Sequence, residues 1–159
     1  MTSIHIVPAT PADVPTILGL IRELAEYEKL LHEVVATEAL VREALFGPRP
    51  VVECVLAQVE NQTVGFALYF FNFSTFLARP GLYLEDLYVR LEHRGHGIGE
   101  SLLRHLARIA VKHGCGRMEW AALDWNRRAI DFYEKVGAVG VKEWTTFRVS
   151  GEALKRLGS

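Results

Sequence analysis

A glycine-rich segment, Arg94-Gly95-His96-Gly97-Ile98-Gly99, has the residue types and spacing of an anion-binding loop. It joins an apolar run at 82–91 to an amphipathic run at 98–113, so it connects a strand to a helix. Glycine permits a tight turn, and the free N–H groups at a helix start attract phosphate. The segment is not Gly-x-Gly-x-x-Gly, because Glu100 follows the last glycine, and it lacks Gly-Lys-Ser/Thr. It therefore predicts a phosphate-bearing ligand.

This loop and the strand before it, Tyr83-Leu84-Glu85-Asp86-Leu87-Tyr88-Val89, resemble the acetyl-CoA site of the GNAT acetyltransferases. The resemblance is greatest to the spermidine/spermine acetyltransferase branch. It implies an acetyl-CoA-dependent N-acetyltransferase that moves the acetyl group directly to a primary amine in a ternary complex. Further matching fragments follow the family order along nearly the whole chain: Pro8-Ala9-Thr10, Glu23-Leu24-Ala25, Tyr27-Glu28, Val64-Gly65-Phe66-Ala67, Trp125-Asn126, Asp131-Phe132-Tyr133 and Gly137-Ala138.

Acetyl transfer requires a route for two protons. The attacking amine must be neutral, and a free alkyl amine has a pKa of about 10.4, so a base or a water path is needed. The resemblance assigns this role to Glu85, which we expect to be a buried carboxylate; the alternative is an ion-paired or edge-exposed side chain. The CoA thiolate has a conjugate acid with a pKa of about 8.5. The resemblance assigns its protonation to Tyr133, on the helix that Asn126 caps; the alternative is core packing.

The expected cofactor contacts divide by physical role. The resemblance places the pantetheine amides against the backbone of Leu87 and Val89, if this strand splays from its neighbour, and against Asn126. Glycine amides hold the pyrophosphate, and Arg94 adds charge near it. The complete expected set is Leu87, Tyr88, Val89, Arg94, Gly95, His96, Gly97, Ile98, Gly99, Glu100, Asn126 and Tyr133.

Five residues are expected to bind the amine. Tyr27, Glu28 and Glu85 match substrate positions of the relatives, whereas Glu119 and Trp120 depart from the residues that the family has there. A compact diamine or a lysine-like, thialysine-type amine is therefore as plausible as a spermine-sized polyamine. Two other readings stay open: an acetyltransferase for lysine or N-terminal amines of proteins, and a regulatory module that only binds acetyl-CoA. The joint presence of a base and an acid favours catalysis.

Bulk properties agree with a small enzyme of one domain, 1–159. The chain has 159 residues, 50% of them hydrophobic, and its net charge of −1 argues against nucleic acid as a partner. Two isolated cysteines, Cys54 and Cys115, predict free thiols and a cytoplasmic location. Six histidines offer no metal-binding motif, so we expect no metal. No apolar run in the sequence is long enough to span a membrane. The aromatic segment 69–73 predicts a homodimer, the arrangement of the relatives.

Alternating runs of β-rich and amphipathic sequence position these residues. Thr10-Pro11-Ala12-Asp13 is typical of a helix start. We expect an α/β fold in which helices flank a mixed, mostly antiparallel central sheet. Strands are expected at 3–7, 51–59, 63–73, 82–91, 118–123 and 144–149, with a hairpin turn at 60–62, and helices from Thr10, from Thr37 to Gly47-Pro48, at 98–113 and at 126–136.

Overall fold

The structure is a computed structural model that describes residues 3–159. The chain divides into two compact units, 1–123 and 124–159, which are described in turn. The prediction of one domain over the whole chain stays a prediction.

A five-stranded sheet forms the centre of the first unit. Its strands lie in the order β1-β2-β3-β4-β5, and every neighbouring pair is antiparallel except the parallel pair of β4 and β5. This confirms the mixed, mostly antiparallel sheet. Both Glu60 and Asn61 have positive φ, which suits the tight turn predicted between β2 and β3. The strands are β1 (Ile4–Pro8), β2 (Glu53–Val59), β3 (Gln62–Ser74), β4 (Arg79–Val89) and β5 (Met118–Glu119).

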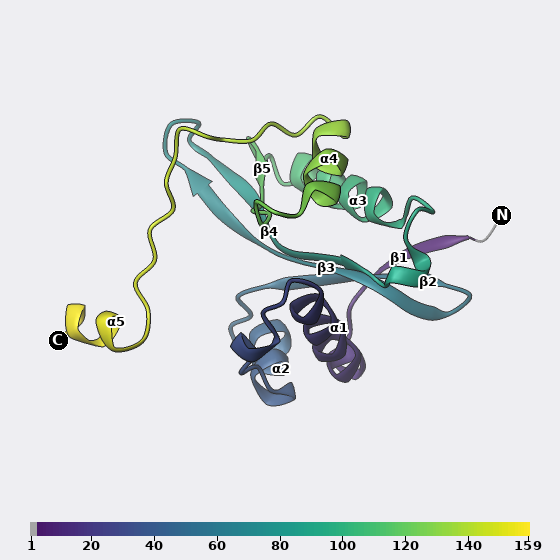
Figure 1. Ribbon diagram of the computed structural model, residues 1–159, viewed down its shortest axis with the longest axis horizontal. Coiled ribbons are helices and arrows are strands. Elements are labelled where there is room, and N and C mark those ends of the chain that lie inside the picture. The colour runs from purple at the N-terminus through teal and green to yellow at the C-terminus, as the bar shows by residue number, and fades with distance from the viewer. Residues whose placement is uncertain (1–2) are drawn as a thin grey trace. The chain divides into compact units, whose positions relative to one another are not determined.

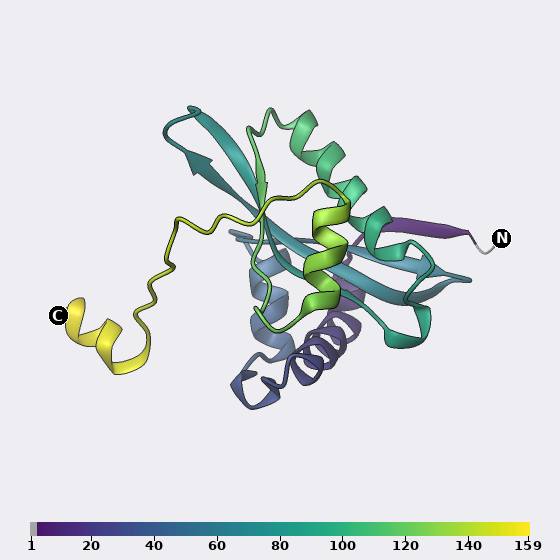
Figure 2. The same ribbon diagram turned by 45° about the horizontal axis from the view of Figure 1, so that its top comes forward.

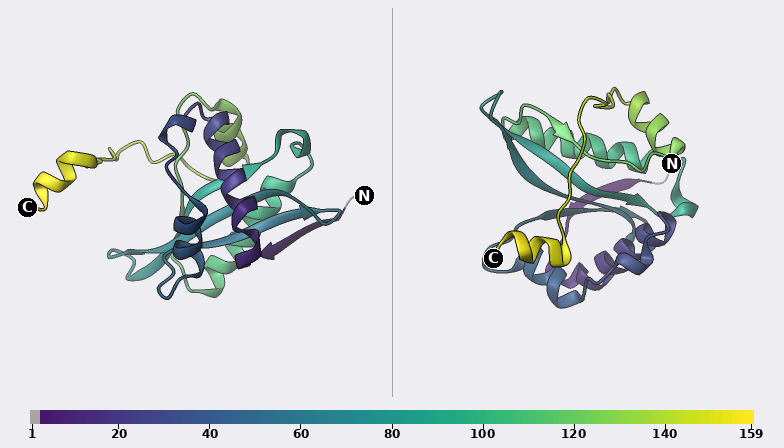
Figure 3. Two further views of the ribbon diagram at one scale, coloured as in Figure 1. Left: turned by 90° about the horizontal axis from the view of Figure 1, so that it is seen from below. Right: turned by 60° about the vertical axis from the view of Figure 1, so that its left-hand side comes forward.

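Helices cover both faces of this sheet (Figure 1, Figure 3). The helices α1 (Val14–Tyr27) and α2 (Glu38–Phe46) lie on one face, and α3 (Ile98–Lys112) lies on the other. Short 3-10 turns occur at Pro11–Asp13, Leu31–Glu33 and Leu91–His93. The face of α1 that packs on the sheet buries Val14, Ile17, Leu18 and Leu20. Phe66, Leu68 and Tyr88 of the sheet lie in the same core.

The predicted helix starts are confirmed by hydrogen bonds. The backbone N–H and the hydroxyl of Thr10 donate to the Asp13 carboxylate at 2.7 and 2.8 Å. The Thr37 hydroxyl accepts from the Leu40 N–H at 3.3 Å. The Thr37 contact satisfies an N–H that the start of α2 leaves unpaired, and the Thr10 contacts fix the chain at the 3-10 turn that leads into α1.

The second unit holds α4 (Arg127–Lys135) and α5 (Gly151–Leu157). The Asn126 side chain accepts from the Ala129 N–H at 3.3 Å, so the expected cap of α4 is confirmed. The strand predicted at 144–149 is wrong, because those residues form no regular structure and α5 follows them. Their β-branched and aromatic pattern favours a strand, but a strand needs a hydrogen-bonded partner and none pairs with this segment within residues 3–159.

None of the helices formed by residues 3–159 is both long enough and apolar enough to cross a membrane.

Candidate active site

A β-bulge in β4 sets the direction of two adjacent carboxylates. Leu68 of β3 is opposite Asp86 and Tyr69 is opposite Leu84, so Glu85 is the extra residue between them. A bulge bends the strand and re-aims its side chains. Glu85 is exposed, which corrects the expectation that its carboxylate is buried. As the extra residue of the bulge, Glu85 has no residue of β3 directly opposite it.

Asp86 is the more buried of these two carboxylates, and its importance is not visible in the sequence. Its cross-strand partner Leu68 lies in the core beneath α1, so Asp86 shares that face of the sheet. Burial, together with the nearby carboxylates of Glu85 and Glu28, raises the pKa of Asp86 to about 6. Asp86 is thus a carboxylate that titrates near neutral pH.

Glu28 completes an acidic cluster of Glu28, Glu85 and Asp86 at the end of α1. Burial raises the pKa of the Glu28 carboxyl. Within residues 3–159, no ion pair involves any member of the acidic cluster. The same residues contain no group of three or more side chains suited to a metal ion. The carboxylates of the acidic cluster are thus not balanced by a cationic side chain of the described residues.

The edge of β4 that faces β5 is open next to this cluster. β5 pairs with β4 only at Leu82 and Tyr83, opposite Met118 and Glu119. The strand expected at 118–123 is therefore only two residues long. From Leu84 to Val89, no strand of residues 3–159 pairs with that edge of β4. Unpaired backbone groups on such an edge accept an added strand-like ligand, as the prediction for Leu87 and Val89 requires.

The glycine loop has the backbone shape of a tight turn into α3. Gly95 and Gly97 have φ values of 82° and 79°, and Gly97 is the residue that caps the helix. A Cβ atom built on either glycine meets no other atom within 4 Å. Glycine is therefore favoured here by backbone conformation, and the space beside the loop is open. The start of α3 directs its free N–H groups toward the loop.

The side chains around this loop make specific contacts. The Arg94 guanidinium lies 4.4 Å from the centre of the Tyr27 ring and 5.3 Å from that of Tyr88. Its Nε donates to the Val89 carbonyl at 2.8 Å. Glu100 forms an ion pair with Arg104 at 2.7 Å. The sequence predicted that Arg94 contacts a phosphate, and it gave no sign of the contact between Arg94 and Tyr27 of α1.

The remaining expected amine-site residues lie at or near β5. Glu119 pairs with Arg117 at 2.9 Å, so part of its charge is already balanced. Burial raises the pKa of Tyr83, and Glu85 and Glu119 raise it further, which places both carboxylates near this ring. Trp120 follows β5 and is partly buried.

In the second unit, Tyr133 lies on α4 with its ring centre 5.4 Å from that of Phe132. Asn126 is at the start of the same helix. These two expected site residues are thus presented by one helix.

Neither cysteine is suited to be a nucleophile. Cys54 is buried, and burial raises the pKa of its thiol to about 12. Burial also raises the pKa of Cys115. A thiol attacks as its thiolate, so the raised pKa values disfavour attack by either side chain near neutral pH.

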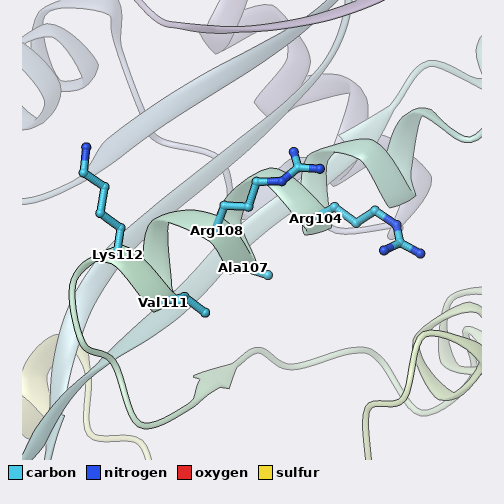
Figure 4. A pocket seen from close by; sticks show the side chains of 5 residues that line it. All are labelled: Arg104, Ala107, Arg108, Val111 and Lys112. Atoms are coloured by element: carbon cyan, nitrogen blue, oxygen red, sulfur yellow. The ribbon is translucent and has the colours of Figure 1, made fainter.

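A shallow basic depression lies along α3, and one of its lining residues, Arg104, is the ion-pair partner of Glu100. Arg104, Arg108 and Lys112 extend from this helix beside Ala107 and Val111 (Figure 4). None of the expected catalytic or amine-binding residues lines it.

The chain was compared with known protein families. Residues 20–138 match the model of the Acetyltransferase (GNAT) family, and the match crosses the boundary between the two units. This chain belongs to the GNAT family. The family is one of acetyltransferases, so the protein is an N-acetyltransferase enzyme.

Individual relatives and solved structures agree with this assignment. The thialysine N-epsilon-acetyltransferase of Bos taurus is 42% identical over 168 residues, which cover 99% of this chain and 98% of the relative. The L-ornithine N5-acetyltransferase NATA1 of Arabidopsis thaliana is 36% identical, with coverage of 94% and 85%. An integron cassette protein from the mobile metagenome of V. cholerae superposes with a TM-score of 0.83 at 30% identity, covering 98% of both chains.

A more distant neighbour was solved with a ligand. The aminoglycoside N-acetyltransferase AAC(6')-Iy in complex with CoA has a TM-score of 0.75 at 15% identity, with coverage of 94% of this chain and 96% of that one. At that identity the likeness shows the shared fold.

Proposed function

We propose that this protein transfers the acetyl group of acetyl-CoA to a primary amine of a small diamine, polyamine or lysine-like molecule. The observation that carries the proposal is the acidic cluster without an ion-pair partner, next to the open edge of β4. The ammonium group of an amine would balance the negative charge of this acidic cluster. The named substrates of the relatives, thialysine and ornithine, are compact amines of this kind.

The residues around the open edge suit acetyl-CoA. The free N–H groups of the glycine loop and the start of α3 are donors for the pyrophosphate. The backbone of Leu87 and Val89 provides strand-like partners for the pantetheine amides. The family resemblance adds Asn126, in the second unit, as a polar contact for the pantetheine arm. When bound, acetyl-CoA provides the activated thioester for the reaction.

The proposed reaction is direct transfer in a ternary complex. The acidic cluster orients the ammonium group, and Glu85 accepts its proton through water. The neutral nitrogen then attacks the thioester carbonyl carbon, forming the C–N bond. The C–S bond breaks, and the Tyr133 hydroxyl donates its proton to the departing sulfur. The nitrogen loses its extra proton as it becomes an amide, and that proton passes through water to restore the tyrosine hydroxyl. The buried, protonated Cys54 agrees with a route that has no acyl-enzyme.

Assembly and location belong to the same proposal. We infer a homodimer from the apolar surface of the long hairpin of β3 and β4 (Figure 2), where Phe73 is 61% exposed and Phe76 is 97% exposed. A cytoplasmic location fits an enzyme with two free thiols.

An amine panel tests the function. The protein is incubated with acetyl-CoA and thialysine, ornithine, putrescine, spermidine, spermine or a lysine-containing peptide, and thiol release is followed. We expect the highest kcat/KM for the short amines that carry a second charge. Butylamine is the matched control for putrescine, because it lacks the second ammonium. A preference for the peptide favours a protein acetyltransferase. If the protein binds acetyl-CoA but releases no thiol with any amine, a regulatory module is favoured.

Replacing Asp86 with asparagine is expected to improve stability and impair amine capture. The folded pKa of about 6 lies above the unfolded value of about 3.9, so the folded state holds its proton more tightly. Stability is therefore lost as pH rises from about 4 to about 6, and Asp86→Asn removes that loss. We expect a higher melting temperature at pH 7, a higher amine KM and a weaker fall in kcat/KM below pH 6.

Glu26→Gln is the matched control for Asp86→Asn. Glu26 is exposed on α1, two residues from Glu28 and outside the acidic cluster. It is expected to change neither the melting temperature nor the amine KM. A lower melting temperature for Asp86→Asn at pH 7, with unchanged KM, contradicts both parts of the prediction.

A further inference from the structure

We propose that Arg94 is a positioning residue that couples the glycine loop to the amine-binding end of α1 by acting through Tyr27. This inference rests on the proposed function, because it concerns how the cofactor and amine sites communicate. It gives Arg94 a different role from the phosphate contact that the sequence resemblance implies.

The contacts of Arg94 join three parts of the fold. The guanidinium lies 4.4 Å from the Tyr27 ring centre on α1 and 5.3 Å from the Tyr88 ring centre on β4. Both distances are within the range of about 6 Å in which a cation is attracted to an aromatic face. The Nε hydrogen bond to the Val89 carbonyl, at 2.8 Å, fixes the side chain at the end of β4. Arg94 also directly precedes Gly95, so its backbone is the start of the glycine loop.

A second arginine from the same connection attaches to the same side of α1. The Arg90 Nη2 lies 3.0 Å from a Glu23 carboxylate oxygen, its Nε donates to the same carboxylate, and its Nη1 donates to the Thr63 carbonyl at 3.1 Å. Glu23 and Tyr27 are four residues apart, so they lie on one face of the helix. The ion pair joins this connection to α1, and the contact of Arg94 with Tyr27 joins it again closer to the C-terminal end of the helix.

That end of α1 carries Glu28, a member of the acidic cluster. Glu28 directly follows Tyr27, and the next residue, Lys29, has a positive φ of 62° where the chain turns away from the helix. A shift of Tyr27 therefore also moves the backbone that carries Glu28. A ligand that orders the glycine loop also orders Arg94, and through Tyr27 it orders one side of the amine site. Such coupling is reciprocal between the two ligands.

The two possible roles of Arg94 predict different kinetics. A phosphate contact acts on the acetyl-CoA dissociation constant. A positioning role acts on the amine KM at saturating acetyl-CoA. Arg94→Met keeps most of the aliphatic stem and removes the cation. We expect it to raise the amine KM about 5-fold or more, the usual lower size of a coupling between sites, with little change in acetyl-CoA affinity by calorimetry.

Two further variants define the contact. Arg94→Lys keeps the charge but loses the planar group that stacks on rings, so we expect an intermediate KM. Arg22→Met is the matched control, because Arg22 is exposed on α1, and it is expected to change neither constant. A rise in the acetyl-CoA dissociation constant with an unchanged amine KM overturns the proposal in favour of the phosphate contact.

Hydrogen exchange tests the same coupling without any turnover. CoA alone is the probe, and the backbone amides of 24–30 and 95–99 are followed. In the parent protein, CoA is expected to protect both segments; in Arg94→Met, it is expected to protect 95–99 but no longer 24–30. Equal protection of 24–30 in both proteins overturns the proposal. If no amine is acetylated but this contrast is present, the proposed function has failed and the coupling stands.

If Arg94→Met does not fold, Tyr27 provides the test. Tyr27→Phe keeps the aromatic face, and Tyr27→Leu removes it. CoA is expected to protect 24–30 in the first variant and not in the second, and protection in both overturns the proposal.

Discussion

Replacing Tyr133 with phenylalanine is expected to lower kcat by about 100-fold or more, the usual size of a general-acid effect, with acetyl-CoA affinity nearly unchanged. The substitution removes one hydroxyl and keeps the ring that packs beside Phe132 on α4. Without the hydroxyl, the CoA thiolate must leave without a positioned proton donor. Steady-state kinetics give kcat, and calorimetry gives the affinity.

Tyr69→Phe is the matched control for this substitution. Tyr69 is 5% exposed, and burial raises the pKa of its hydroxyl to about 12. It lies in β3 outside the proposed machinery, so its loss is expected to leave kcat unchanged. Full turnover by Tyr133→Phe, with chemistry shown to be rate-limiting, returns Tyr133 to a packing role and leaves solvent to protonate the thiolate.

Replacing Gly97 with aspartate is expected to weaken acetyl-CoA binding about 30-fold. Gly97 has a φ of 79°, a left-handed conformation that aspartate tolerates almost as well as asparagine, so the backbone contributes little to the loss of affinity. The new carboxylate lies at the helix start that would hold the pyrophosphate, and its repulsion of that group costs about 2 kcal/mol. This cost corresponds to the expected loss, which calorimetry with acetyl-CoA measures.

Gly97→Asn separates the effect of the new charge on acetyl-CoA affinity from any effect of the substitution on folding. Asparagine has nearly the shape of aspartate, tolerates positive φ and carries no charge. We expect it to keep most of the affinity. Aspartate is also a favourable residue at a helix start, so the melting temperature of Gly97→Asp should stay close to that of the parent. Equal affinity of the aspartate variant and the parent would falsify the phosphate-loop assignment.

Elements with strong local signals could be predicted from the sequence. The apolar periodicity of α3 and the capping residues Thr10, Thr37 and Asn126 define helix starts by contacts within a few residues. The alternation of β2 and β3 around the turn at Glu60 and Asn61 is equally local. Such signals need no knowledge of the tertiary structure.

Features that depend on a partner could not be predicted. The segment 144–149 has the pattern of a strand, but pattern alone does not supply a neighbouring strand. The short β5 and the bulge at Glu85 depend on how β4 meets both of its neighbours. The alternation of an ideal strand places Glu85 and Asp86 on opposite faces, so only the bulge makes both of them members of the acidic cluster.

The motif in the sequence predicted the glycine loop of the candidate site. The arrangement of charged side chains around the loop became visible only in the structure. Nothing local marks the raised pKa of Asp86, because it depends on burial beneath α1 and on Glu28, far away in the chain. The contact of Arg94 with Tyr27 also joins residues distant in sequence. Long-range contacts of this kind leave no periodic signal in a single sequence.

The bulge at Glu85 also bears on how such a site can arise or be lost. An extra residue in β4 corresponds to one inserted codon, a change that leaves the core residues on either side intact. Deleting Glu85 restores the regular ladder with β3 and removes the local bend. In this fold, a single-codon deletion would therefore remove both the bend of β4 and the proposed proton acceptor.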